Sequence, residues 1–502
     1  MGKILPASAI LVVFMIMAGL NRGFDISDEG LYVLLADPLQ ANVAGIFNYD
    51  LLLKLNYQLF GYSFSLVELR FLRLLLYLTG AWALVGFWKN VTEEHKLDWS
   101  HFWILCLGIF SGYAFLPPSL SYNSLTVVLT CFWLKLISEA EFSVITVILL
   151  GVVLAFFAYV KISLVMIFIL MTILAILFLK KENPFKVVLL FLPFIFLELI
   201  FFMLLDENAL TRLTDGIPLN RQRPSYQLVH LVKSVLVGVF WVAIPAFFFF
   251  GVGYLGRTKK NALYNIMAIV AIGGFCLVCF LTHVTEEWNH IVLIFSAAVL
   301  GYYFGKGPSP FGILNLWAII LFLLPFLLHF GSNVYWLRIG IHYWVFWIMA
   351  FFLLSKIEPR KLSIPISFIS LVLVFNGIWW HPFGLDTPLW TEKVEWIRNG
   401  NETIYIDPEQ VELAKKIKEW KSVRGNTELL AAYRIPGLVW LADLRIPYSP
   451  GFWEERQLII FFKNQPEEMI YCNLEALPED WSFGHAKNLG QIQGNNFQLL
   501  WD

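Results

Sequence analysis

Apolar runs of membrane-crossing length recur along this chain and limit the folds it can adopt. Of its 502 residues, 58% are hydrophobic and 15% are charged, whereas soluble proteins average about 25% charged residues. A helix needs about 20 apolar residues to cross a bilayer. Such runs predict about thirteen transmembrane helices, at 4–20, 71–88, 101–116, 119–137, 143–160, 162–179, 186–205, 233–255, 262–281, 290–305, 312–330, 340–355 and 362–380. We therefore expect a polytopic α-helical membrane protein.

The charge of the connecting loops predicts an orientation. Lysines gather in alternate connections, which read "KNVTEEHK", "KKENPFK", "GRTKKN", "GKGPSP" and "SKIEPRK". Short loops rich in Lys and Arg stay in the cytoplasm. The first run lacks a convincing cleavage site before Asn21, so we expect a retained anchor. These features predict a multi-pass protein of the plasma (inner) membrane, with a cytoplasmic N-terminus and an extracytoplasmic C-terminus.

The composition changes near residue 380 and divides the chain into two expected domains. Residues 1–380 form the transmembrane domain, in which 21–70 is the first outer loop, and residues 381–502 form a soluble extracytoplasmic domain. In the second part "ETIYID", "TELLAAY", "RQLIIFFK" and "EMIYCNL" predict strands, and "PEQVELAKKIKEWK" predicts a helix. The expected fold is a small α/β domain, which docks on the membrane part or orients an acceptor.

Charge and cysteine content argue against several classes of function. The net charge of −1 leaves no basic footprint for nucleic acid. Four of the five cysteines lie in apolar runs and are expected to serve packing. A loop metal site at "LTHVTEEWNH" stays open, through His283, Glu286, Glu287 and His290, although its His spacing is not a recognised zinc pattern. We assign no metal ligand and no certain cofactor, and a divalent metal stays an alternative.

Acidic residues gather just after the first apolar run, in "FDISDEGLYVLLADP". Asp25, Asp28 and Glu29 are spaced to share one side of a helical turn, and a short amphipathic helix along the outer interface is expected to follow. Asp50 lies further along the same loop. Two carboxylates delivered to one outer cavity would provide a general base. The alternatives are that Asp25 or Glu29 caps the helix and that Asp37, before a proline, makes a turn.

Cations at the outer ends of apolar spans are candidate phosphate ligands. Arg212, Arg221 and Arg223 lie in one outer loop, "TRLTDGIPLNRQRPSYQLVHLVK". Arginine binds phosphate with two parallel hydrogen bonds. Lys161 stands in an apolar region without an adjacent acid. The alternatives are binding of lipid headgroups by the loop and extension of Lys161 to the interface.

The segments "DISDEGLYVLLADP", "FNYDLLLKLNYQLFG" and "ELRFLRLLLYLTGAW" together resemble the C-type (GT-C) membrane glycosyltransferases. They are most similar to the branch with protein O-mannosyltransferases and lipid A aminoarabinose transferases. That branch has an Asp-Glu pair after the first span, which Asp28 and Glu29 match. It also has a later acid, matched by Asp50, and an arginine entering the second span, matched by Arg70 or Arg73.

The resemblance extends weakly into a later span, and two positions depart from it. "GVVLAFFAYVKIS" resembles a Gly-rich span that ends in a Lys-Pro-Thr-like turn. Lys161 matches the lysine, but Ile162 replaces the proline. Asp50 precedes "LLLK", where the family usually has a Lys-Pro-Pro-like stretch.

The resemblance implies transfer of a sugar from a polyprenyl-phosphate donor to a glycan, lipid or protein acceptor on the outer face. Asp28 would be the base, with Glu29 and Asp50 beside it. Lys161, Arg70 or Arg73 and the cations of the outer loop would bind the phosphate. Membrane lipids are expected partners. The alternatives are a transporter or flippase, which would carry ionisable groups at mid-membrane, and a polysaccharide polymerase or ligase.

Overall fold

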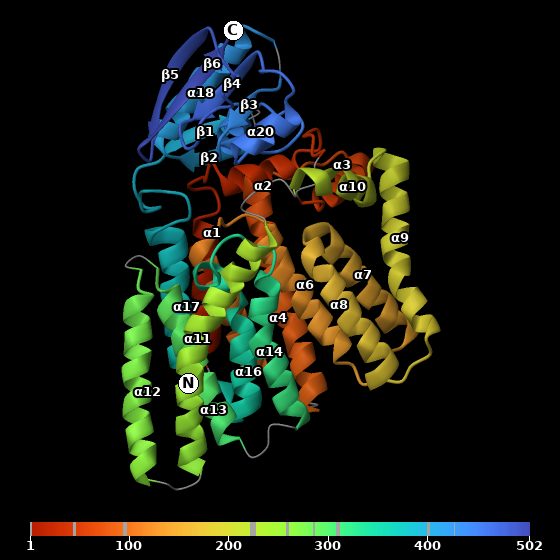
Figure 1. Cartoon of the computed structure of the whole chain (residues 1–502), viewed down its shortest axis with the longest axis vertical. Coiled ribbons are helices and arrows are strands. Elements are labelled where there is room, and N and C mark those ends of the chain that lie inside the picture. The colour runs from red at the N-terminus through yellow and green to blue at the C-terminus, as the bar shows by residue number, and fades with distance from the viewer. Residues whose placement is uncertain are drawn as a thin grey trace.

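The structure is a computed structural model and divides into a large helical part and a small C-terminal part that contains the strands. Figure 1 shows the two parts stacked along the long axis of the molecule. The residues described are 3–43, 47–93, 98–220, 227–257, 261–284, 287–307, 312–398, 402–425 and 427–502.

Helices occupy every apolar run that the sequence predicts as a span. From the N-terminus, the first helices are α1 (Ile4–Ala18), α2 (Asp28–Ala36), α3 (Asp50–Phe60), α4 (Leu66–Thr92), α5 (Trp99–Phe110), α6 (Tyr122–Ile137), α7 (Val144–Val160), α8 (Ile162–Leu174), α9 (Phe185–Leu205) and α10 (Ala209–Asn220). They continue with α11 (Leu228–Arg257), α12 (Asn261–Leu281), α13 (Asn289–Lys306), α14 (Ile313–His329), α15 (Trp336–Ile339), α16 (Trp344–Ser355) and α17 (Ser363–Phe375). A short 3₁₀ turn, η1 (Ser111–Phe115), extends α5, and another, η4 (Gly340–Tyr343), precedes α16. A π turn, η2 (Ala175–Leu179), follows α8, and another, η6 (Asn376–Trp380), follows α17.

Among the described residues, seven helices are long and apolar enough to cross a membrane. They span Leu66–Thr92, Ile162–Leu179, Phe185–Leu205, Leu228–Arg257, Ala262–Leu281, Trp336–Ser355 and Pro359–Trp380. Shorter apolar helices fill the other predicted runs, apart from α13, whose first two residues and last residue are polar. The helical part therefore contains helices with the length and composition of membrane spans, and insertion into a membrane, the number of thirteen crossings and their orientation stay predictions.

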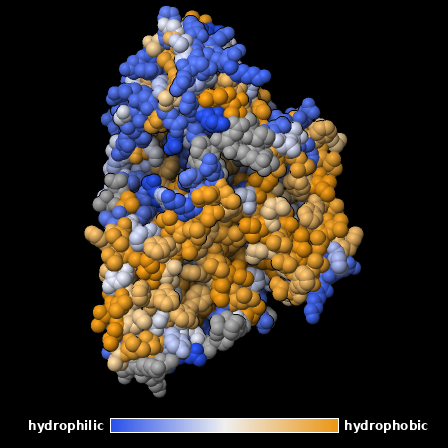
Figure 2. All heavy atoms as spheres, viewed as in Figure 1, coloured by the Kyte–Doolittle hydropathy of each residue, from blue (hydrophilic) through white to orange (hydrophobic). Residues whose placement is uncertain are grey.

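The surface of the helical part is apolar, and the surface of the C-terminal part is mostly polar (Figure 2). Close helix packing inside the apolar part depends on small residues. On α13, a Cβ added at Gly301 would lie 2.1 Å from the carbonyl oxygen of Ala246 on α11. One turn later, a Cβ at Gly305 would lie 2.1 Å from the carbonyl oxygen of Phe250. The two helices pack with their backbones in contact, as small residues allow in membranes.

The C-terminal part contains two sheets and three helices. The strands are β1 (Val394–Arg398), β2 (Glu402–Ile406), β3 (Leu430–Ala432), β4 (Glu468–Cys472), β5 (His485–Ile492) and β6 (Asn495–Trp501), and the helices are α18 (Pro408–Ser422), α19 (Pro436–Leu441) and α20 (Glu455–Phe461). β1 and β2 form an antiparallel pair, and the larger sheet has the order β3-β4-β6-β5. β3 and β4 are parallel and the other pairs of that sheet are antiparallel. The small α/β character matches the sequence expectation.

One predicted strand of this part is wrong. The segment "RQLIIFFK" contains helix α20. The side chain of Glu454 accepts from the backbone of Gln457, whose side chain accepts from the N–H of Glu454, and this capping box starts the helix. Short apolar runs do not separate helix from strand by periodicity, so the flanking cap decides.

The C-terminal part shares a hydrophobic core with the first loop of the chain. Phe24, Leu34 and Leu69 pack in one buried cluster with residues of α18, α19 and the larger sheet. Backbone hydrogen bonds join the same parts, from Gly23 N–H to the oxygen of Tyr405 and from Tyr405 N–H to the oxygen of Asn21, both 2.8 Å. The C-terminal part is therefore fixed directly against α2 and the start of α4.

Helix α2 lies between the two parts of the molecule, and its setting corrects one expectation. The sequence predicts an amphipathic helix along the interface, but all residues from Glu29 to Ala36 are buried. A Cβ added at Gly30 would lie 2.3 Å from the backbone nitrogen of Gly437, so α2 and α19 touch through two glycines. Helix α3 fits the interface better, because Leu59 and Phe60 are exposed at its end.

Candidate active site

A cavity of about 610 Å³ lies where the helical part meets the C-terminal part. Its walls come from the start of α2, the end of η1, the segment before α16, the segment after η6, and the loops of the C-terminal part. Both charged and apolar groups line it. The carboxylate, arginine and histidine members are Asp25, Asp28, Glu287, Arg338, His381, Arg434 and Glu454. Such a cavity can hold a ligand with a charged head and an apolar body.

Two carboxylates of the first loop reach this cavity from the start of α2. Asp25 accepts hydrogen bonds from the backbone N–H groups of Ser27, at 3.1 Å, and Glu29, at 3.0 Å. It therefore caps α2, as one alternative from the sequence predicts. Asp28 is half-buried, and within the described part of the chain no hydrogen bond or ion pair occupies its carboxylate. Asp28 is thus the acid of this pair that is open to a ligand.

Burial changes the acidity of both carboxyl groups. It raises the pKa of Asp28 to about 6, an effect that the positive charge of Arg434 partly offsets. It raises the pKa of Asp25 to about 7, with a further contribution from the negative charge of Asp28. The sequence alone gives no reason to move these values from about 3.9. A carboxylate with a pKa near neutrality is better matched to proton transfer than an unperturbed one.

Two arginines line the cavity together with these acids. Arg338 donates from Nη2 to Glu287 Oε1 at 2.9 Å, and its guanidinium lies 5.0 Å from the ring centre of Phe115. Arg434 is exposed, and no ion pair occupies it within the described residues. Neither arginine is among the phosphate ligands that the sequence predicts. The position of Arg434 becomes apparent only when α19 packs on α2.

Glu29 and Arg70 are close to the cavity carboxylates, but their contacts stabilise the fold. Arg70 donates from Nε and Nη2 to both carboxylate oxygens of Glu29, at 2.9 and 2.7 Å. Its other N–H groups donate to the backbone oxygens of Leu20, Arg22 and Gly23. An arginine has five N–H donors, and all five are used here. Arg70 therefore has no donor left for a phosphate, and we do not include it among the proposed phosphate ligands.

Arg73 is fully buried one turn further along α4. It donates to the backbone oxygens of Pro117, at 2.5 Å, and Gly112, at 3.1 Å, and its guanidinium lies 4.0 Å from the ring centre of Tyr113. These contacts hold the segment that carries Phe115 into the cavity wall. Arg73 does not itself line the cavity. Its geometry supports a positioning role rather than direct contact with a phosphate.

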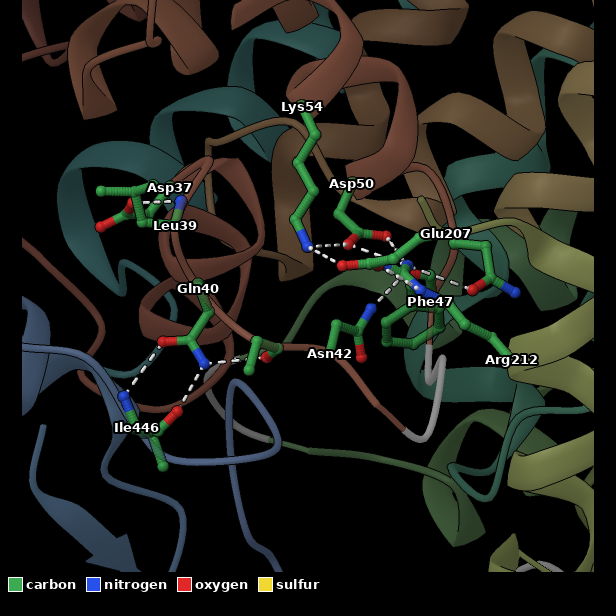
Figure 3. Close-up of polar contacts among 12 residues, drawn as sticks. Asp37, Leu39, Gln40, Asn42, Phe47, Asp50, Lys54, Glu207, Arg212 and Ile446 are labelled. Atoms are coloured by element: carbon green, nitrogen blue, oxygen red, sulfur yellow. Dashed lines mark hydrogen bonds and ion pairs between the residues drawn. The ribbon is translucent and has the colours of Figure 1, made fainter. Parts of the chain in front are cut away.

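Asp50 and Arg212 meet each other (Figure 3), and neither of them lines the cavity. Nη1 of Arg212 lies 2.7 and 2.9 Å from the two oxygens of Asp50. Glu207 also pairs with Arg212, and Lys54 lies 3.7 Å from Asp50 and 3.5 Å from Glu207. This network joins α3 to α10. The sequence expectation that Asp28 and Asp50 share one cavity is therefore wrong, because Asp50 points to α10.

Lys161 lies at the junction of α7 and α8, behind the cavity wall. Its ammonium donates to the backbone oxygen of Leu328 at 2.7 Å and lies 5.9 Å from the ring centre of Tyr122, which lines the cavity. Among the residues described, no carboxylate pairs with Lys161. A phosphate contact through this lysine stays a prediction. Arg221 and Arg223 lie outside the described residues.

The remaining predicted residues concern a metal and a turn. Glu286 lies outside the described residues, while Glu287 pairs with Arg338 at 2.9 Å. Within the described ranges no three His, Cys, Asp or Glu side chains are grouped to hold a metal ion. Asp37 accepts from the backbone N–H of Leu39 at 2.9 Å and pairs with Arg445 at 3.1 Å. It makes the predicted turn and also tethers the C-terminal part.

Comparisons of the chain with known protein families, with characterised proteins and with solved structures found no match.

Proposed function

We propose that this protein is a membrane glycosyltransferase of the GT-C type that uses a polyprenyl-phosphate sugar as donor. The observation that carries the proposal is the Asp28 carboxylate, which faces a cavity of about 610 Å³ and has no hydrogen bond or ion pair among the described residues. Arg338 and Arg434 line the same cavity. A base and two cations in one cavity suit the deprotonation of an acceptor and the departure of a phosphate.

The proposed reaction is a displacement at the anomeric carbon of the donor sugar. Asp28 takes the proton of an acceptor hydroxyl or amine, whose oxygen or nitrogen then bonds to that carbon. The bond from the carbon to the phosphate oxygen breaks, and the polyprenyl phosphate leaves with the electron pair. Arg338 and Arg434 offset the charge that develops on the phosphate. A phosphate leaving group stabilised in this way needs no general acid.

Neighbouring groups keep Asp28 in place and adjust its acidity. Asp25 caps the first turn of α2, and its nearby carboxyl group is electrostatically linked to Asp28. The pair formed by Glu29 and Arg70 fixes the same turn against α4. Asp28 thus stands on a rigid helix end rather than on a mobile loop, which favours precise positioning of a base.

The place of the cavity suggests where the substrates enter. It opens between an apolar helical part and a polar C-terminal part (Figure 2). The lipid tail of the donor would lie among the membrane helices, and the acceptor, a glycan, a lipid or a protein, would approach beside the C-terminal part. On the proposed orientation this is the outer face of the plasma membrane.

Transfer by the purified chain tests this proposal. The chain in detergent would be given polyprenyl-phosphate sugars with candidate acceptors, and release of polyprenyl phosphate would be measured. We expect release that depends on the acceptor. In Arg434→Ala we expect a higher KM for the donor, with the effect reduced in Arg434→Lys. Movement of the intact donor between leaflets without release would instead support a flippase, and stepwise extension of a lipid-linked glycan would support a polymerase.

A further inference from the structure

A second cavity, of about 600 Å³, lies at the opposite end of the helical part from the C-terminal domain. Trp88 and Thr92 line it from the end of α4, whereas Arg70 holds the beginning of that helix near the first cavity. Helix α4 has 27 residues and is therefore about 40 Å long at about 1.5 Å per residue. The two cavities are thus separated by most of the thickness of the helical part, and the second takes no part in the proposed reaction.

The polar wall of the second cavity carries both signs of charge. Lys356 and Glu358 are exposed beside it, and within the described residues no ion pair occupies either of them. Arg360 lies 3.3 Å from Asp98 and donates to Ser100 Oγ at 3.1 Å. Among the described residues the wall therefore holds two cations and two carboxylates, of which one cation and one carboxylate have no ion pair there.

The backbone at Lys356 adds a second observation. Lys356 ends α16 with a φ of 54°, in the left-handed region. Glycine is the usual residue at such a helix end, because a side chain is strained there. Lys356 adopts this conformation at the end of α16, where it lines the cavity.

The other wall of the cavity is apolar. Phe352 and Leu353 are buried on α16, and Leu314 approaches from α14. The ring of Trp88 lies 4.8 Å from that of His101, and both residues line the cavity. Tryptophan is common in membrane proteins where hydrocarbon meets lipid headgroups. A ligand of this cavity must therefore be amphiphilic.

We propose that the second cavity binds a zwitterionic phospholipid through its phosphoethanolamine headgroup. Lys356 and Arg360 contact the phosphate, Glu358 and Asp98 contact the ammonium group, and the apolar wall contacts the start of the chains. Basic pockets between membrane helices are known to bind lipid headgroups. The two carboxylates distinguish this cavity from a simple anion site, because they would repel a second negative charge.

Binding of short-chain lipids to the purified full-length chain in detergent tests this proposal. The probes are dihexanoyl phosphatidylethanolamine, dihexanoyl phosphatidylglycerol and inorganic phosphate, each titrated by calorimetry. We expect the first to bind most tightly. Lys356→Gln should weaken it about tenfold, the loss expected for one charge-assisted hydrogen bond. Glu358→Gln should weaken phosphatidylethanolamine and leave phosphatidylglycerol unchanged or tighter.

Lys361→Gln is the matched control, because Lys361 is exposed beside the cavity without lining it. It should bind all three probes as the unchanged protein does. The melting temperature of each variant would establish that folding is intact. Equal losses in Lys356→Gln and Lys361→Gln would overturn the site. Preference for phosphatidylglycerol would overturn the zwitterionic headgroup, and equally tight binding of inorganic phosphate would overturn a lipid in favour of a free anion.

Discussion

Glu29 and Arg70 form a two-point ion pair in the core, with Nε to Oε1 at 2.9 Å and Nη2 to Oε2 at 2.7 Å. The preceding residue, Asp28, faces the cavity and is open to a ligand. Adjacent acids of one sequence motif thus have different tasks. One fixes the helix end, and the other is the proposed base.

Removing the charge of Glu29 should lower the stability of the fold rather than slow the chemical step. Breaking a buried pair leaves the other charge without compensation and costs about 3–5 kcal/mol. Glu29→Gln should therefore lower the melting temperature in detergent sharply. Glu68→Gln, which changes a partly exposed acid of the α4 capping box and keeps an oxygen that can accept the same backbone hydrogen bond, is the control and should have a smaller effect. A Glu29→Gln protein of normal stability with lost turnover would return Glu29 to the catalytic residues.

The pH dependence of turnover should follow the two cavity carboxyl groups. The pKa of Asp28 is raised to about 6 and that of Asp25 to about 7. A base must be deprotonated, so turnover should rise as the pH passes through this range and then level off. The two groups titrate together, so the apparent pKa belongs to the pair.

The variant Asp25→Asn makes the pH test specific. It removes the carboxyl group that titrates at the higher pH, with a pKa of about 7, and leaves Asp28, with a pKa of about 6, while an asparagine can still cap the helix. The rise in turnover should then move to lower pH. An activity profile of the unchanged protein that is flat or falling from about pH 5 to 8 would argue against a carboxylate base.

The sequence was a good guide to the helices and a poor guide to what surrounds the first loop. The length of each apolar run predicted the position of a helix, because a helix that crosses a bilayer needs about 20 apolar residues. The burial of α2 depends on α19 and Gly437, some 400 residues later in the chain, and no local pattern reports such contacts. The same long-range packing brings Arg434 to the cavity. Another contact between distant parts of the chain pairs Asp50 with Arg212, and no local pattern predicts it.

The pair of Asp50 and Arg212 should contribute to stability and leave the chemistry unchanged. Asp50→Asn and Arg212→Met should each destabilise the protein. A double-mutant cycle should give a coupling energy of about 1–3 kcal/mol, because the side chains are in contact. The kcat of the folded protein should stay within about threefold, because neither group lines the cavity. A loss of about 100-fold in kcat at normal stability would place Asp50 in the reaction, as the resemblance implies.

Lys161 offers a separate test of the donor site. Replacing it with methionine keeps the length of the side chain and removes the charge. If the lysine turns from the backbone oxygen of Leu328 to the donor phosphate, Lys161→Met should raise the KM for the donor and leave kcat nearly unchanged. Lys180→Met, at an exposed ammonium, is the control. Unchanged kinetics with the donor below saturation would remove Lys161 from the site.

The turnover of Asp28→Asn tests the central claim most directly. Asparagine keeps the shape of the side chain and cannot accept the proton, so transfer should fall about 10²- to 10⁴-fold while the melting temperature stays near that of the unchanged protein. Asp37→Asn is the matched control, since Asp37 makes a turn and a partly exposed ion pair, and it should retain nearly full turnover. Near-normal transfer by folded Asp28→Asn, with donor and acceptor both saturating, would contradict the account.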